Sequence, residues 1–365
     1  QHLSGGAGDD FLTSVGYSSM IVGGGGDDYL LGLGFKNDFF GGAGDDLMVG
    51  VGIQNYYYMG DGDDLIINLG YAGTAYYGGG HDVAYLAGGD EWLNGEEGDD
   101  QMVVDEDAEG NKLDGGKGDD AFIMGGRQNT FDGDDGGDTF ILTFDVIDNL
   151  IAEVSSEDQL VLGVGMGPQD VWFSREDNDL VIEIDRWDGT GEAPEETVGR
   201  VTIENWYLED ANQTELLFGY DDAAHSANRL SASAINALVD MMAGLARGSA
   251  EGGFYSALPS ASAAALTAVW EAAETLNDVS VNGWDLQLVN WEPAEAAATE
   301  EAAEAEEAAE NEEAESDDAE ETESTTEEAT ESETEVEPTQ QGSDQDDALQ
   351  GGADENEFDY DVIDG

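Results

Sequence analysis

Apolar residues return along the first part of the chain at a nearly fixed spacing. They occupy the middle of short β-prone runs at Leu12, Leu30, Met48, Ile66, Ala84, Met102, Phe122 and Phe140. The gaps are 18 residues, with a single gap of 20. A fixed period of this length is typical of solenoids. Because alternate side chains of a strand point to opposite faces, each run predicts a short strand whose middle residue points inward.

A second series of short runs lies half a period later. It keeps a glycine but has no aspartate at the matching place, and its inward positions are Ile21, Phe39, Tyr57, Ala75, Leu93, Leu113 and Phe131. Each 18-residue coil is therefore predicted to contain two strands and two edges. Asn37, Asn55, Asn111 and Asn129 recur at this second edge and are expected to be turn residues, with a weak ion site as the alternative. The two-residue insertion within 105–110 is placed on this edge.

The outward positions of the first series are also apolar, which a solenoid in water does not need. They include Phe11, Tyr29, Leu31, Leu47, Val49, Leu65, Ile67, Val83 and Tyr85, here called the apolar stripe. Exposed apolar patches of this size mark packing surfaces. We expect later helices of the same chain to cover the stripe, with a partner chain or an adjoining domain as the alternative.

Two positions before each inward residue of the first series stands an aspartate. These marker aspartates are Asp10, Asp28, Asp46, Asp64, Asp82, Asp100, Asp120 and Asp138, each two residues after a glycine. Neighbouring strands lie about 4.8 Å apart, and unit charges at that distance repel by about 3 kcal/mol at an effective dielectric constant of about 20. A divalent cation between successive coils would remove this repulsion. Ca²⁺ accepts six to eight oxygen ligands, including backbone carbonyls, which glycine-rich turns can direct to one point.

The nonapeptide G-G-x-G-x-D-x-U-x describes these copies, most closely at GGAGDDFL, GGGGDDYL, GGAGDDLM and GGKGDDAF. In this respect the chain resembles the repeats-in-toxin family of exported bacterial proteins. The resemblance implies a mainly β fold, a right-handed parallel β-roll, and six-coordinate sites holding up to about seven calcium ions between successive coils. The implied ligands are the marker aspartates with backbone groups of Gly5, Ala7, Gly8, Gly23, Gly24, Gly25, Gly26, Gly41, Gly42, Ala43, Gly44, Gly60, Gly62, Gly116 and Gly118.

The rest of the chain has a different pattern. After the roll at 1–141, the 18-residue period stops and 142–221 is expected to be a β-rich cap, with a hairpin between 171–174 and 180–185. Apolar residues at helical spacing predict two amphipathic helices within 222–292, the second beginning after Pro259. The acidic run at 293–341 is expected to be a disordered linker, and 342–365 to hold two degenerate nonapeptides.

Composition narrows the function. The net charge of −77 excludes nucleic acid as a natural partner, and there is no cysteine for a disulfide scaffold and no apolar run long enough to span a membrane. The three histidines form no hydrolase or metalloprotease motif. His81 is expected to be a variable turn residue, and the regular carboxylates suit ion stacking better than acid–base catalysis.

We therefore expect a calcium-binding, non-catalytic folding module of a larger protein, secreted or at the cell surface. By the resemblance it would be exported by type I secretion machinery and fold outside the cell. An adhesin is one possible parent. The alternative is the folding and export module of a secreted protease, lipase or pore-forming cytolysin whose active domain lies upstream.

Overall fold

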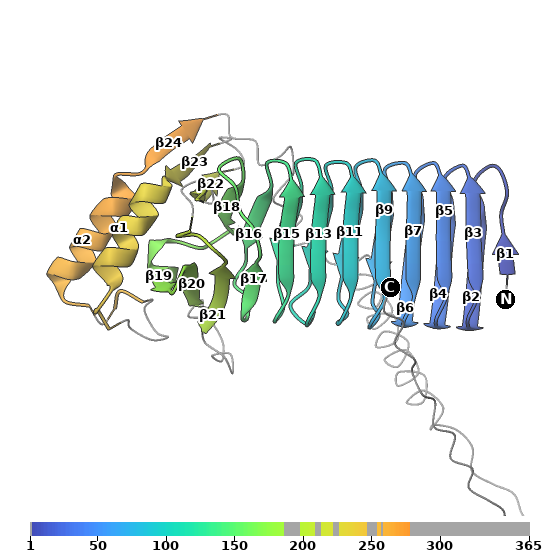
Figure 1. The fold of residues 1–365 in the computed structure, drawn as a ribbon, viewed down its shortest axis with the longest axis horizontal. Coiled ribbons are helices and arrows are strands. Elements are labelled where there is room, and N and C mark those ends of the chain that lie inside the picture. The colour runs from blue at the N-terminus through green and yellow to red at the C-terminus, as the bar shows by residue number, and fades with distance from the viewer. Residues whose placement is uncertain are drawn as a thin grey trace, which may run out of the picture. The chain divides into compact units, whose positions relative to one another are not determined.

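The structure is a computed structural model, and it describes residues 2–185, 198–208, 213–221, 226–246, 254–256 and 258–277. In this part of the chain the fold is mainly β, with two 12-stranded sheets and two α-helices. The coils of the solenoid follow one another along its long axis (Figure 1). Expectations for the acidic run at 293–341 and the degenerate repeats at 342–365 fall outside the described residues.

The two sheets form the two sides of the solenoid, and the chain alternates between them. The first sheet contains β1 (His2–Ser4), β3 (Met20–Gly25), β5 (Asp38–Ala43), β7 (Tyr56–Asp61), β9 (Thr74–Gly79), β11 (Trp92–Glu97), β13 (Lys112–Lys117), β15 (Thr130–Asp135) and β17 (Asn149–Ile151). The second contains β2 (Phe11–Tyr17), β4 (Tyr29–Phe35), β6 (Leu47–Ile53), β8 (Leu65–Asn68), β10 (Val83–Leu86), β12 (Gln101–Val104), β14 (Ala121–Met124), β16 (Thr139–Leu142) and β18 (Gln159–Leu162).

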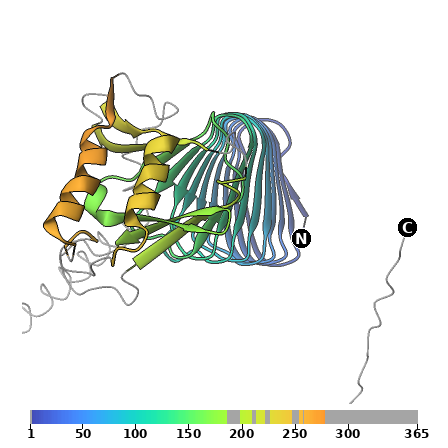
Figure 2. The ribbon, with the colours of Figure 1, turned by 60° about the vertical axis from the view of Figure 1, so that its left-hand side comes forward.

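All of these neighbours are parallel, and paired residues lie 18 positions apart in the sequence, or 20 where a coil is longer. Leu30 pairs with Met48, and Phe39 pairs with Tyr57. The predicted parallel β-roll of 18-residue coils is thereby confirmed. Figure 2 looks obliquely along the axis and shows the coils one behind another.

The core is a stack of the inward residues that the two periods predicted. From Ile21 to Phe140 these side chains are at most 1% exposed, while Leu12 in the first coil is partly buried. Aromatic rings of successive coils stack, as in Phe39 and Tyr57, whose centroids are 4.8 Å apart. Each coil therefore buries its apolar face only against its neighbours, which is the usual energetics of a repeat protein.

Parallel stacking continues past Ile141, although the 18-residue spacing ends there. β17 pairs with β15 and β18 with β16, each with an offset of 20 residues. The first sheet then ends with β21 (Val198–Ile203), β20 (Asp179–Asp185) and β19 (Val171–Glu176). β21 is parallel to β17, β20 is antiparallel to β21, and β19 is antiparallel to β20. The hairpin expected between 171–174 and 180–185 is the β19–β20 pair. The second sheet ends with β22 (Glu215–Asp221), β23 (Ser226–Leu230) and β24 (Glu274–Asn277).

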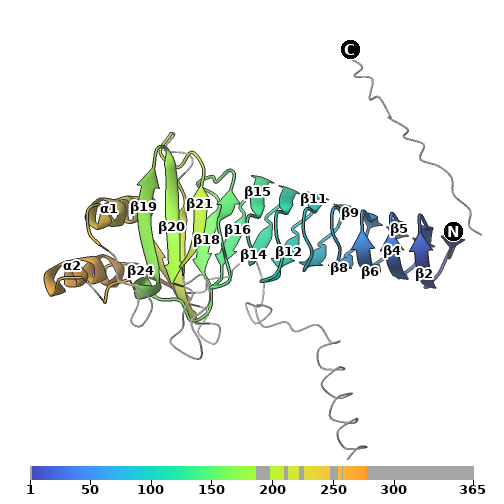
Figure 3. The ribbon, with the colours of Figure 1, turned by 90° about the horizontal axis from the view of Figure 1, so that it is seen from below.

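Two α-helices lie at the end of the solenoid opposite β1 (Figures 1 and 3). α1 (Ala232–Met242) buries the face predicted from its spacing, at Ile235, Leu238, Val239 and Met242. α2 (Ser260–Glu271) begins directly after Pro259 and buries Leu266 and Trp270. A short 3₁₀ helix, Pro168–Asp170, precedes β19.

The helices do not cover the apolar stripe, so that expectation was wrong. α1 packs on β19 and against β22, β23 and α2, and Phe173 and Phe218 contact the Trp270 ring. The physical reason is that the cap strands expose their own large side chains at the end of the solenoid, and the helices bury those. Within the stripe itself, Phe11 is 68% exposed, the residues from Tyr29 to Val83 are half-buried and Tyr85 is buried.

Candidate metal centre along the Asp edge

The marker aspartates form one continuous hydrogen-bonded ladder along one edge of the solenoid, here called the Asp edge. In each step the backbone N–H of one aspartate donates to Oδ1 of the equivalent aspartate in the next coil. The N···O distances lie between 2.7 and 2.9 Å from Asp10 to Asp138. The 105–110 insertion leaves the ladder intact, because Asp100 still donates to Asp120 at 2.8 Å. One oxygen of each carboxylate is thus committed to holding the coils in register.

The second oxygen of these carboxylates has no hydrogen-bond partner. This applies to Oδ2 of Asp28, Asp46, Asp64, Asp82, Asp100 and Asp120, all of them buried. A buried carboxylate oxygen without a donor is costly. Six such oxygens in one row are therefore stable only when the carboxyls are protonated or when a cation shares the space.

The first glycine of the nonapeptide makes room for each carboxylate. A Cβ on Gly23 would stand 2.2 Å from Asp28 Oδ2, and a Cβ on Gly41 would stand 2.2 Å from Asp46 Oδ2. Gly5 has the same relation to Asp10. Glycine stands at this position in six of the eight coils, where it leaves room for Oδ2, whereas Met59 and Tyr77 occupy it before Asp64 and Asp82.

The other glycines of the motif shape the turn. Left-handed backbone, which favours glycine, occurs at Gly8, Gly24, Gly26, Gly42, Gly44, Gly60, Gly62, Gly116 and Gly118. The carbonyls of Gly25 and Ala43 accept hydrogen bonds from the coil before, at 2.5 and 2.8 Å. Ala7 lies in an exposed turn. The structure thus brings the expected residues together at one edge; whether each ligates an ion stays a prediction.

Burial raises the pKa of the ladder carboxyls from Asp46 to Asp158. It raises the pKa of Asp46 and Asp82 to about 6, of Asp64 and Asp120 to about 7, and of Asp100 and Asp138 to about 8. Backbone hydrogen bonds oppose the rise, and like charges in neighbouring coils add to it in all six. Without a cation, the fold therefore favours the protonated form of these groups.

A second ladder runs along the outside of the same edge in the opposite sense. Here the side chain of the residue before a marker aspartate accepts a hydrogen bond from a backbone N–H of the next coil. For example, Asp45 N–H donates to Asp27 Oδ1 at 3.0 Å. His81 is part of this ladder. Its backbone N–H donates to Asp63 Oδ1 at 2.9 Å, and its ring Nδ1 accepts from the backbone N–H of Asp99 at 3.2 Å. The sequence interpretation of His81 as a variable turn residue missed this role.

Asp158 extends the inner ladder by one rung and was also missed. It accepts from Asp138 N–H at 2.9 Å. The signals that could have found it are its position 20 residues after Asp138 and the inward Leu160 two residues later. Ser156 stands where the motif has glycine, and this hid the copy.

These residues fit a calcium ion, with one condition. Among the described residues, no group of three or more His, Cys, Asp or Glu side chains converges as a metal site. Any ion on the Asp edge must therefore complete its coordination with backbone carbonyls of the glycine turns, which suits Ca²⁺ better than metals that prefer nitrogen or sulfur ligands.

The edge opposite the Asp edge carries a ladder of asparagines. Asn111 N–H donates to Asn129 Oδ1, and Asn129 N–H to Asn149 Oδ1, both at 2.9 Å. The interpretation of these asparagines as turn residues needs correction. The left-handed corner residues are the ones directly before them in sequence, such as Lys36 and Gln128, whereas the asparagines are buried and bond one coil to the next.

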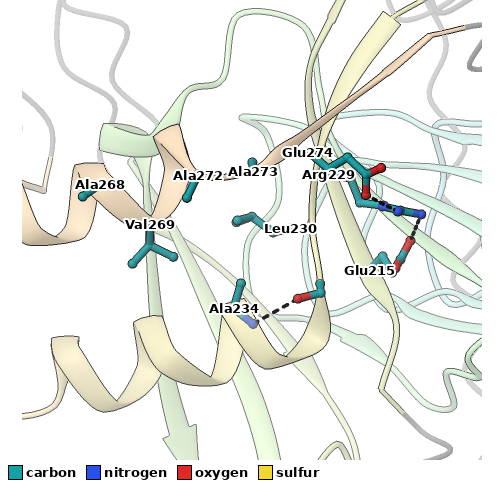
Figure 4. Close-up of a pocket in the computed structure, with 10 residues that line it drawn as sticks. Glu215, Arg229, Leu230, Ala234, Ala268, Val269, Ala272, Ala273 and Glu274 are labelled. Atoms are coloured by element: carbon teal, nitrogen blue, oxygen red, sulfur yellow. Dashed lines mark hydrogen bonds and ion pairs between the residues drawn. The ribbon is translucent and has the colours of Figure 1, made fainter.

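A pocket of about 470 Å³ lies at the cap, between α1, α2, β23 and β24 (Figure 4). Its floor is mostly apolar, with Leu230 and Val269 among the lining residues. The charged groups at one side pair with each other, since Arg229 contacts Glu215 at 3.1 Å and also Glu274. The pocket lies where the two helices pack against the cap strands.

The chain is similar to parts of two very large toxins. Both are named multifunctional-autoprocessing repeats-in-toxin. The one from Vibrio vulnificus is 34% identical over 147 residues, or 39% of this chain, and the one from Vibrio cholerae is 34% identical over 132 residues, or 34% of this chain. The chain spans about 3% of the length of either toxin.

A crystal structure of the extracellular lipase LipA from Serratia marcescens aligns with 47% of this chain and 38% of the lipase, at 16% identity and a TM-score of 0.14. A TM-score this low adds nothing to the fold seen in the strands themselves. No protein-family model matches the chain. No helix in the described part of the chain is long and apolar enough to cross a membrane. The period, the glycine turns, the stacked aspartates and the identity to the two toxins together confirm that this chain carries repeats of the repeats-in-toxin type.

Proposed function

We propose that this chain is a calcium-binding module that folds when calcium is present, and that it is structural rather than catalytic. The observation that carries the proposal is the row of six buried Oδ2 atoms without hydrogen-bond partners. Calcium bound along the row would supply the positive charge that these oxygens need. The marker aspartates would contribute Oδ2, and the glycine turns would contribute carbonyl oxygens.

Calcium would then act as a switch for folding. With a net charge of −77, the chain repels itself, and the buried ladder adds a further penalty when its carboxyls ionise. Binding free energy available only to the folded state would offset both, because the sites do not exist in the unfolded chain. Such a chain stays unfolded where calcium is scarce and folds where it is abundant.

This behaviour suits a protein that is exported unfolded. We therefore propose a secreted or cell-surface location, export by type I secretion machinery, and a role as a module within a larger protein. The small share of the two toxins that the chain spans supports a modular role. A structural exoprotein or adhesin is the parent we favour.

The second candidate is a folding and export module attached to a toxin or a secreted hydrolase. The specific observation in its favour is that the two similar proteins are toxins by name. The two candidates differ in the other domains of the parent protein. Tandem binding domains in the full gene product would favour an adhesin, and a catalytic or membrane-active domain would favour a hydrolase or a toxin.

The proposed function is tested by titrating the chain with calcium after treatment with a chelator. Far-ultraviolet circular dichroism should change from a disordered spectrum to a β-rich one as calcium reaches millimolar levels, while magnesium at the same concentration should be much less effective. A chain that is already fully folded in chelator would contradict the proposal.

A further inference from the structure

The asparagine ladder opposite the Asp edge is interrupted in the middle of the solenoid. In the rungs after the interruption, the side-chain amides also donate to loop carbonyls: Asn111 Nδ2 to Gly88 O at 3.1 Å, and Asn149 Nδ2 to Gly125 O at 2.9 Å. At two successive coils the asparagine is replaced, first by Gly73 and then by Glu91. An ionised glutamate has no N–H to offer such carbonyls.

Glu91 is buried inside the roll, with only 3% of its surface exposed. Its backbone keeps the ladder, because Glu91 N–H donates to Asn111 Oδ1 at 2.9 Å. Its Oε2 has no hydrogen-bond partner, and neither does Nδ2 of Asn68 close by. The Asn68 side chain and the Gly73 backbone lie close enough to lower the pKa of Glu91, but burial outweighs them and raises it to about 7.

The space around Glu91 is lined by oxygen atoms. The position that a Cβ would take on Gly73 lies 2.4 Å from Glu91 Oε2 and 2.7 Å from the carbonyl oxygen of Asn55. The equivalent position on Gly70 lies 2.8 Å from the Gly52 carbonyl oxygen and 2.9 Å from Asn68 Oδ1. The same point is 3.5 Å from Glu91 Oε1. Five oxygens therefore lie around these two Cβ positions. Three of them already accept one backbone hydrogen bond each: Gly52 O from Tyr71, Asn55 O from Thr74 and Asn68 Oδ1 from Gly70.

No cationic side chain compensates this cluster. The ion pairs formed by described residues involve His81, Lys117, Arg200 and Arg229, and none of them includes Glu91. The hydroxyl of Tyr57 approaches Asn68 Oδ1 at 3.4 Å, and so it adds one more polar group to the same interior corner. A buried carboxylate among carbonyls is stable only when it is protonated or when a cation shares the space.

We propose that Glu91, Asn68 and the carbonyls of Asn55 and Gly52 form a single calcium site on the edge opposite the Asp edge. The donors are all oxygens, which Ca²⁺ prefers. Only one of them carries a formal charge, so this site should bind calcium more weakly than the Asp edge does. It would fasten the coils at the one place where the asparagine ladder is broken.

The test is a calcium count on the full chain with the substitution Glu91→Gln. Glutamine keeps the size of the side chain, removes its charge and supplies the N–H₂ that asparagine provides in the complete rungs. Asp90→Asn is the matched control, because Asp90 is the exposed neighbour whose left-handed backbone asparagine tolerates. Calcium stoichiometry is measured by isothermal titration calorimetry, and terbium luminescence excited through tyrosine gives an independent count.

We expect Glu91→Gln to lose one ion relative to the parent chain and Asp90→Asn to lose none. The result is a difference between variants, so it does not depend on how many ions the Asp edge holds. An equal count in Glu91→Gln and the parent would overturn the proposal and leave Glu91 as a protonated rung. If Glu91→Gln does not fold in calcium, Glu91→Asn, which restores the rung used elsewhere, is compared in the same way.

Discussion

Acid should partly replace calcium in folding this chain, because protonation and metal binding relieve the same repulsion. The perturbation is a change of pH in the presence of a chelator. Burial raises the pKa of Asp64 to about 7 and that of Asp100 to about 8, from an ordinary value of 3.8. Their folded-state pKa lies above the unfolded one, so the unfolded chain binds fewer protons between the two values and stability falls as pH rises through that window.

The magnitude follows from the shifts. One pKa unit corresponds to about 1.4 kcal/mol, so the rise at Asp64 corresponds to about 4 kcal/mol of destabilisation once the pH exceeds both values. A typical domain is stable by only about 5 to 15 kcal/mol in total. A few ladder carboxyls are therefore enough to keep the calcium-free chain unfolded at pH 8 and to let it fold as the pH approaches 5.

The assay is circular dichroism with thermal unfolding at a series of pH values, with light scattering to confirm that the chain remains monomeric. In chelator, β content and the midpoint temperature should increase as pH decreases from about 8 to about 5. In saturating calcium the dependence should reverse, because calcium competes with protons for the same oxygens. Stability in chelator that is flat or rises with pH would refute this reasoning.

Three further outcomes are expected. Asp64→Asn should increase the stability of the calcium-free chain and lower the number of bound calcium ions, by more than one if each aspartate serves two coils. The control Asp63→Asn, at the exposed neighbour, should change the number of bound ions little, and calorimetry measures both. Gly41→Ala should weaken calcium binding at least tenfold, because the new Cβ would stand 2.2 Å from Asp46 Oδ2, and Gly25→Ala should be tolerated because its nearest contact is 3.9 Å. A similar affinity in both variants would contradict the idea that Gly41 makes room for the Asp46 carboxylate. Asn129→Ala should lower the free energy of unfolding by about 3 kcal/mol at every calcium concentration, since it removes one accepted and two donated hydrogen bonds. Urea unfolding that shows no loss would exclude a structural role for the asparagine ladder.

Much of the roll could be predicted because its signal is repeated. Each coil places an inward residue and an aspartate at a fixed distance, so the inward stacks from Ile21 to Phe140 followed from spacing alone. The hairpin of β19 and β20 and the start of α2 followed from turn residues and Pro259. These features depend on local sequence, where pattern and structure are closely linked.

Features that depend on contacts between coils could not be predicted in the same way. Asp158 lacks the preceding glycine, and only its hydrogen bond from Asp138 shows that it is a rung. His81 and Glu91 replace an aspartate and an asparagine, and their roles depend on neighbours one coil away. Whether the helices cover the apolar stripe depends on which apolar surface they pack against, and they pack against the cap strands rather than the side of the roll.

The most direct test of calcium on the Asp edge is a crystal structure of the chain grown in millimolar calcium, with anomalous scattering used to locate the metal. Density should appear between successive coils, about 2.3 to 2.6 Å from Oδ2 of the marker aspartates and from carbonyl oxygens of the glycine turns. Oδ2 atoms of Asp46, Asp64 and Asp82 that contact only water or protein, in a folded chain at neutral pH, would contradict the account.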